Sequence, residues 1–171
     1  MDAARETTFQ RLQSNLDGLA AIYRQLLDVV YKERELLISA DLDQLRQNTE
    51  SKEAILQKAR FADTVRVRIA EEMAAEVGAN AQDPRLLEIS DKLGGEKGAQ
   101  LRRQHQILES LIRKVTQANL ENEEYTKSAL RNLDGAMNNL KESISGKKTY
   151  GGKGRYKMGP EVSGNFVSKE A

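Results

Sequence analysis

Two asparagines interrupt an apolar stripe in a long predicted helix, and their type and spacing suit recognition chemistry. Asn119 and Asn122 stand on the same helical face as a series of large apolar residues three and four positions apart. That series is Leu130, Leu133, Met137, Leu140 and Ile144. A buried amide without hydrogen-bond partners costs about 1 to 3 kcal/mol, so we expect a polar group to meet this face. The asparagines either contact a partner protein or set the register between packed helices, and the sequence leaves both open.

Side chains suited to catalysis or metal binding are sparse. His105 is the only histidine, and the chain has no cysteine, so no thiolate is available. A catalytic histidine needs a nucleophile or carboxylate beside it, and a metal needs further ligands at matching spacing. The Gln- and Arg-rich flanks of His105 offer neither. Glu121, Glu123 and Glu124 spread over more than one helical face, which is typical of solvated charges.

The piece GKKTYGGKGR has a superficial likeness to a phosphate-binding loop. Gly151 follows Gly146 after four residues, but Gly152 stands where the loop needs its lysine, and no strand precedes it. Nucleotide binding is therefore not expected. Taken together, the sequence predicts neither an enzyme nor a metal or cofactor site.

The composition favours long, solvent-exposed helices over a thick globular core. Among 171 residues, aromatics make up 5% and charged residues 31%, with no Trp. Residues 146–171 hold six bases against two acids, while the rest of the chain is slightly acidic. A nucleic-acid binder would line a folded face with bases, so we expect no nucleic-acid partner. No apolar run resembles a signal peptide or a spanning segment, and we expect a cytoplasmic protein without membrane insertion.

Apolar periodicity predicts an all-α fold, an elongated antiparallel helical bundle or coiled coil of three long helices plus one short helix. The first long helix should start near Ala3 to Thr8 and run to about Ser39. The other two should cover Leu42 to about Val77 and about Lys97 to Ile144, with the short helix at 84–93. The first has the most regular seam, at Phe9, Leu12, Leu16, Leu19, Tyr23, Leu26 and Val30. The second has a weaker seam and should be more exposed, with Leu42, Leu45, Thr49, Lys52, Leu56, Ala59, Val65, Ile69 and Met73.

The connection between the first two helices lacks both Gly and Pro. Asp41 suits an N-cap, because its carboxylate can accept the free amide hydrogens of the next turn. The connection is then either a short kink or a tight helical hairpin, and the sequence leaves the choice open.

The sequence divides into a helical bundle domain, residues 1–145, and a flexible Gly- and Lys-rich tail, residues 146–171. Half of the twelve glycines lie in the tail, which should be disordered when alone. Three aromatics also lie there, at Tyr150, Tyr156 and Phe166. They form either a short docking motif or part of a solvated chain end.

Three stretches together resemble the FlgN-like flagellar export chaperones. The family's hairpin pattern "E..LL...DL..L...T..K...L" is similar to Glu33, Leu36, Leu37, Asp41, Leu42, Leu45, Thr49, Lys52 and Leu56. A second stretch, with Ala118, Asn119, Asn122, Leu130 and Leu133, resembles the segment of the family's last helix that carries asparagines followed by leucines. The piece TYGGKGR, residues 149–155, resembles the aromatic and glycine turn that follows. The order and spacing of the three stretches make the resemblance specific.

The resemblance implies a type III export chaperone for hook-filament junction proteins (FlgK- and FlgL-like). Such a chaperone holds the client's amphipathic C-terminal helix and delivers it to the export gate, where the receptor is FlhA-like. Tyr150 matches the family's gate-docking tyrosine, with Tyr156 as a competing alignment.

We expect the client groove on the second half of the last helix, because a groove on a helical surface suits an amphipathic helix. Its predicted residues are Asn119, Asn122, Tyr125, Ala129, Leu130, Leu133, Met137, Leu140 and Ile144. Gly135 should let a partner backbone approach closely. The alternatives are packing against the first helix only, or a structural coiled-coil scaffold that self-associates through this face.

Overall fold

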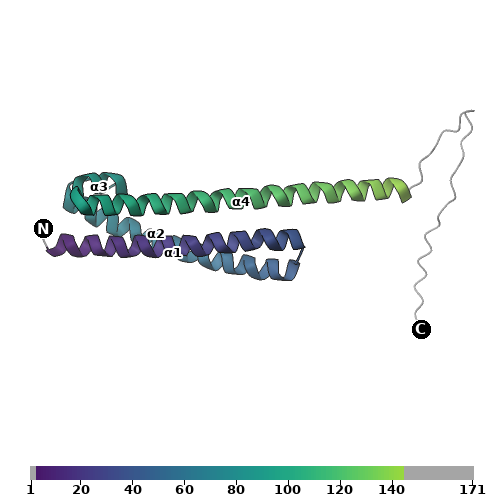
Figure 1. Cartoon of the computed structure of the whole chain (residues 1–171), viewed down its shortest axis with the longest axis horizontal. Helices are drawn as coiled ribbons and strands as arrows, with labels where there is room; N and C mark the ends of the chain where they lie inside the picture. The colour runs from purple at the N-terminus through teal and green to yellow at the C-terminus, as the bar shows by residue number, and fades with distance from the viewer. Residues whose placement is uncertain (1–2, 145–171) are drawn as a thin grey trace, which may run out of the picture. The chain divides into compact units, whose positions relative to one another are not determined.

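The structure is a computed structural model in which residues 3–144 are described. It contains α1 (Ala3–Ser39), α2 (Leu42–Val77), α3 (Leu86–Leu93) and α4 (Gly95–Ile144), and no strand occurs within this range (Figure 1). The predicted all-α fold of three long helices and one short helix is confirmed. The bounds of the second helix agree with the prediction, and α4 begins two residues earlier than expected.

The chain divides into two units. The first covers residues 1–126 and holds α1, α2, α3 and α4 as far as Thr126. The second covers residues 127–171, of which the structure describes the end of α4, residues 127–144. The predicted flexible tail lies outside the described residues.

A two-residue turn makes α1 and α2 a tight hairpin. Ala40 adopts the left-handed conformation at φ 54°, which reverses the chain directly after Ser39. Asp41 caps α2 as expected, because its Oδ1 accepts the backbone N–H of Gln44 at 3.0 Å. The hairpin alternative therefore holds and the kink does not.

Side-chain bonds to backbone carbonyls show that α1 and α2 run antiparallel. Asn15 near the start of α1 donates to the carbonyl of Ala62 late in α2 at 3.2 Å, while Asn48 early in α2 donates to Val29 of α1 at 3.1 Å. A high residue number in one helix thus pairs with a low number in the other.

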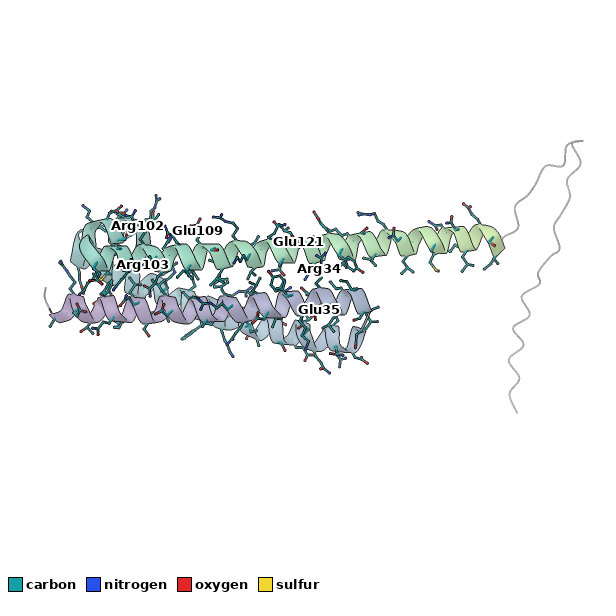
Figure 2. All side chains as sticks on the ribbon, viewed as in Figure 1. Arg34, Glu35, Arg102, Arg103, Glu109 and Glu121 are labelled. Carbon is teal, nitrogen blue, oxygen red and sulfur yellow. The ribbon has the colours of Figure 1, made fainter. Side chains whose placement is uncertain are left out.

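α4 runs parallel to α1 within the first unit. Its Gln104 donates to Asp17 of α1 at 2.9 Å, and further along, Glu121 pairs with Arg34 at 3.5 Å. Figure 2 shows Arg34 and Glu121 on the facing sides of these two helices. Residue numbers therefore rise in the same direction along the two helices, and both contacts join residues that are 87 positions apart in the sequence.

Lys97 joins the beginnings of α4 and α1. Its ammonium group donates to the Glu6 carboxylate and lies 5.3 Å from the centre of the Phe9 ring. The hydrogen bond from Lys97 lowers the pKa of the Glu6 carboxyl, because it stabilises the charged form.

The core is built on the regular seam of α1, which is confirmed: apart from the half-buried Tyr23, its apolar side chains are no more than 2% exposed. Each fully buried side chain of this size contributes about 1.5 to 3 kcal/mol. The other helices complete the cluster with Ile69, Met73, Leu86, Ile89, Leu101 and Leu108.

The predicted seam of α2 is wrong near the hairpin. Leu42 is 75% exposed and Thr49 is also exposed, whereas Asn48 is buried. The polar residue is buried there because its amide reaches a carbonyl of α1. Periodicity of apolar residues does not detect a face that is held by a hydrogen bond.

The turn from α3 into α4 brings their backbones unusually close. Gly94 and Gly95 take positive φ angles of 63° and 52°, which lets the chain reverse sharply. Gly98 in the first turn of α4 is buried, and a Cβ placed on it would lie 2.3 Å from the carbonyl oxygen of Ser90. A side chain at position 98 therefore requires a backbone shift.

We predict that Gly98→Ala destabilises the bundle by about 1 to 3 kcal/mol, because the added methyl group forces α3 and α4 apart. Gly18→Ala in α1 is the matched control, since a Cβ there meets no atom within 4 Å. The control should gain about 0.5 to 1 kcal/mol from helix propensity. Urea unfolding measures both, and equal stabilisation by the two variants would show that the close approach is absent.

Candidate partner-binding surface

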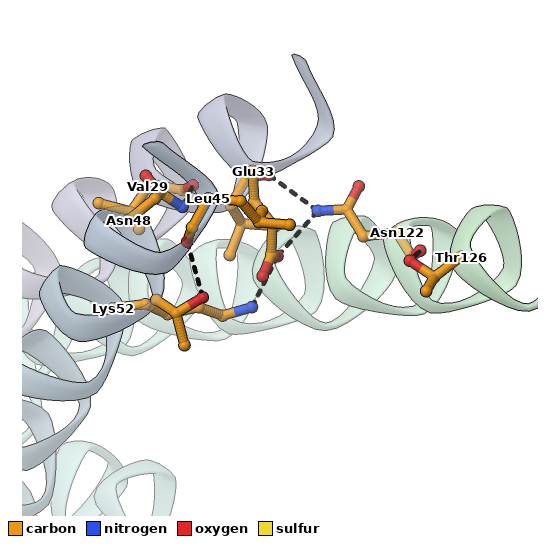
Figure 3. A network of polar contacts seen from close by, with 9 residues as sticks. Val29, Glu33, Leu45, Asn48, Lys52, Asn122 and Thr126 are labelled. Atoms are coloured by element: carbon orange, nitrogen blue, oxygen red, sulfur yellow. Dashed lines mark hydrogen bonds and ion pairs between the residues drawn. The ribbon is translucent and has the colours of Figure 1, made fainter. Parts of the chain in front are cut away.

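One carboxylate joins all three long helices. The Oε2 atom of Glu33 in α1 accepts from Lys52 Nζ of α2 at 2.7 Å and from Asn122 Nδ2 of α4 at 3.0 Å (Figure 3). The side chains of Glu33 and Lys52 are only 16% and 19% exposed. Charge-assisted hydrogen bonds of this kind are stronger than neutral ones, so they fix how the three helices align.

Two asparagines donate hydrogen bonds to neighbouring backbone carbonyls of α1. Asn48 of α2 donates to Val29 at 3.1 Å, and Asn122 of α4 donates to Val30 at 2.9 Å. Both asparagines are buried. Because a carbonyl has two lone pairs, each can accept a side-chain amide in addition to its helical bond.

The two asparagines predicted as partner contacts differ in their surroundings. Asn122 is 4% exposed, and its Nδ2 group is used inside the bundle, so the register alternative describes it. Its predicted partner contact is corrected accordingly. Asn119 is half-buried, and its side chain makes no hydrogen bond to a described residue. A partner role for Asn119 stays a prediction.

Five of the exposed large apolar residues follow one another at regular spacing in the second unit. Every residue of α4 from Lys127 to Ile144 is exposed. The five large apolar side chains in this range, which we call the α4 stripe, are 49% to 69% exposed: Leu130, Leu133, Met137, Leu140 and Ile144. Ala129 is exposed too, and Tyr125, at the end of the first unit, is 36% exposed. Contiguous apolar surface of this kind marks an interaction site more often than a free surface.

The two flanks of the α4 stripe have different chemistry. At 3.6 residues per turn, one flank carries the small residues Ala129, Ala136 and Ser143, and the other carries Lys127, Asp134 and Lys141. Gly135 falls on the opposite side of the helix. The expectation that Gly135 allows a partner to approach is therefore wrong, and the small residues of the first flank have the position for that role.

His105 lies at a cavity of the first unit. It is half-buried and lines a cavity of about 610 Å³ between α2, α3 and α4, with an apolar floor that includes Leu86, Leu108 and Ile112. Its Nδ1 atom is buried and has no hydrogen-bond partner among the described residues. Residues 3–144 contain no group of His, Asp and Glu arranged to hold a metal, and none of their helices is long and apolar enough to cross a bilayer.

Sequence periodicity missed Glu33 and Asn48 as structural residues. Glu33 and Lys52 stood in the family-like hairpin pattern, so the resemblance was the signal for them. Asn48 had no comparable signal. Tyr150, the predicted gate-docking residue, lies outside the part of the chain that the structure describes.

We predict that Asn122→Ala destabilises the protein by about 1 to 3 kcal/mol, because Val30 loses a buried hydrogen bond and Glu33 a partly buried one. Asn119→Ala, three residues away, should change stability by less than about 0.5 kcal/mol, because its side chain bonds to no described residue. Thermal and urea unfolding compare the two. If the two substitutions cost the same, Asn122 does not set the register.

Comparison with known proteins agrees with the resemblance seen in the sequence. A family model described as FlgN protein matches residues 1–158. Nothing matches the chain among curated proteins or solved structures. Members of the matched family are flagellar export chaperones, which bind export substrates. Because the match covers far more than half of its residues, the chain belongs to the FlgN family of flagellar export chaperones.

Proposed function

We propose that the α4 stripe binds the amphipathic C-terminal helix of a hook-filament junction protein (FlgK- or FlgL-like) in the cytoplasm, before export. The observation that carries the proposal is the exposure of five large apolar side chains on one helical face of a family member. The family resemblance implies that the C-terminal helix of an unassembled junction protein is amphipathic, so it would have an apolar face to cover.

The spacing of the α4 stripe suits a helical client. Its residues alternate steps of three and four, the pattern by which one helix packs along another with a slight left-handed supercoil. The flank with the small residues Ala129, Ala136 and Ser143 allows the backbone of a client helix to approach closely. The flexible side chain of Met137 adapts its shape to different clients. A client helix with apolar residues at the same spacing fits this surface.

The size of the surface predicts moderate affinity. Covering five half-exposed side chains contributes roughly 1 to 2 kcal/mol each, about 5 to 10 kcal/mol in total. Ordering the two partners offsets part of this gain. The net affinity therefore also depends on the apolar surface that the client covers. A chaperone that must release its client needs only moderate affinity, near the micromolar range of about −8 kcal/mol.

We also propose that the tail docks the loaded chaperone at the export gate, through Tyr150 and an FlhA-like receptor. This assignment rests on the match between Tyr150 and the family's tail tyrosine, with Tyr156 as the competing residue. Both tyrosines lie beyond the described residues.

The second candidate function is a coiled-coil scaffold that self-associates through the α4 stripe. The alternating spacing favours it as well, because two copies of the stripe match each other. A solution mass measurement at high micromolar concentration separates the two. A chaperone should be monomeric or weakly associated, whereas a scaffold should form a stable multimer.

We predict that Leu133→Asp with Leu140→Asp abolishes binding of a junction-protein C-terminal peptide, because two buried carboxylates would be left unpaired in the complex. Helicity should stay largely intact, since both leucines are more than half exposed. Ser128→Asp with Asn139→Asp adds the same charge on the opposite face of α4 and serves as the control. Calorimetry and circular dichroism check the result; collapse of helicity in the first variant alone would make the face structural.

Deletion of residues 146–171 should leave client binding unchanged and impair export in cells. Tyr150→Ala and Tyr156→Ala, compared in the full chain, identify the docking residue. Secretion of the junction protein into the medium is the readout. Normal secretion after the deletion contradicts a docking role for the tail.

A further inference from the structure

A second surface lies in the first unit, between α1 and α4. It is a groove of about 430 Å³ lined by Arg24 of α1 and, on α4, by Arg103, Gln106, Ile107, Ser110, Leu111 and Lys114. Figure 2 shows Arg103 in the space between these two helices. The groove is separate from the α4 stripe, because its last residue is Lys114.

The groove has an unbalanced charge. Three of its lining side chains, Arg24, Arg103 and Lys114, are cations, and none is an acid. None of the three forms an ion pair or hydrogen bond with a described residue. Two other cations of the same helices are paired, Arg11 with Glu72 and Arg113 with Glu109. The groove therefore presents three cations that form no ion pair with a described acid.

The groove also has an apolar floor. Ile107 is 46% exposed, and Leu111 is half-buried beside it. A small inorganic anion would leave this apolar surface uncovered. Proteins that bind single-stranded nucleic acids stack aromatic side chains on the bases. The lining of this groove contains no aromatic residue. A ligand that combines carboxylates with aliphatic side chains matches both features.

We propose that this groove binds an acidic amphipathic helix of another protein. Arg103 and Lys114 are 11 residues apart, about 16 Å along α4. A partner segment of about three helical turns spans that distance, with carboxylates near its ends for the cations and aliphatic side chains between them for Ile107 and Leu111. Opposite charges across the groove speed association and select acidic segments over basic ones.

The test uses a synthetic 18-residue helical peptide with leucines at three- and four-residue spacing and glutamates beside them. Its affinity for the full chain is measured by fluorescence anisotropy, together with a version in which every Glu is Gln. We expect saturable one-to-one binding that weakens as salt rises. Arg24→Glu, Arg103→Glu and Lys114→Glu combined should weaken it about 10- to 100-fold, since each exposed pair contributes a modest share.

The matched control reverses three cations of α2 outside the groove, with Arg46→Glu, Lys58→Glu and Arg68→Glu. The affinity for the peptide should then change by less than about threefold, because only the long-range electrostatic potential of the protein changes. Circular dichroism checks that both triple variants stay folded. No saturable binding at millimolar concentration, equal losses in the two triple variants, or equal affinity for the Gln peptide each overturns the proposal.

Two further measurements distinguish the groove from the α4 stripe and from a nucleic-acid site. The variant with Leu133→Asp and Leu140→Asp should still bind the acidic peptide; loss of binding there would place the peptide on the α4 stripe and overturn the assignment. An RNA oligonucleotide of equal charge should not displace the peptide at matched concentration. Displacement that depends on the three groove cations would assign the groove to nucleic acid instead.

Discussion

A helix buries its apolar face only where other helices cover it, and this limit sets the organisation of the chain. α4 has 50 residues, whereas α1 and α2 have 37 and 36 and end together in the hairpin at Ala40 and Asp41. Asn122 is the last buried residue of α4. Beyond Thr126 the helix still carries large apolar residues at regular spacing, and all of them are exposed. The bundle thus buries the first part of α4 and leaves the α4 stripe uncovered, which is the surface that we propose for recognition.

The polar network around Glu33 gives the bundle its alignment. Leucines in helical seams tolerate small shifts between helices, because apolar contact has no fixed direction. The hydrogen bonds from Lys52 and Asn122 to the Glu33 carboxylate do not tolerate such shifts, because they require a fixed distance and direction. A buried charge that loses one partner is costly, so the three helices keep one register. Since α4 is held this way at Asn122, its packing contributes to the bundle without using the α4 stripe.

Most of the fold was predictable from the sequence, and the site only in part. The seam of α1, the cap at Asp41 and the long last helix follow from local rules of periodicity and capping. The burial of Asn48 and the exposure of Leu42 do not, because each depends on which neighbouring helix reaches that position. The same holds for Asn122: spacing placed it on the right face, but only its distance to Val30 and Glu33 shows that it sets the register.

Hydrogen exchange on the full chain, alone and with a junction-protein C-terminal peptide, tests the central claim most directly. In the free protein, amides of residues 127–144 should exchange fast and those of the α1 and α2 core slowly, because exposed helix opens more easily than packed helix. With the peptide, strong new protection should appear in residues 127–144. Protection that appears only in residues 3–126, or none at saturating peptide, would contradict the account.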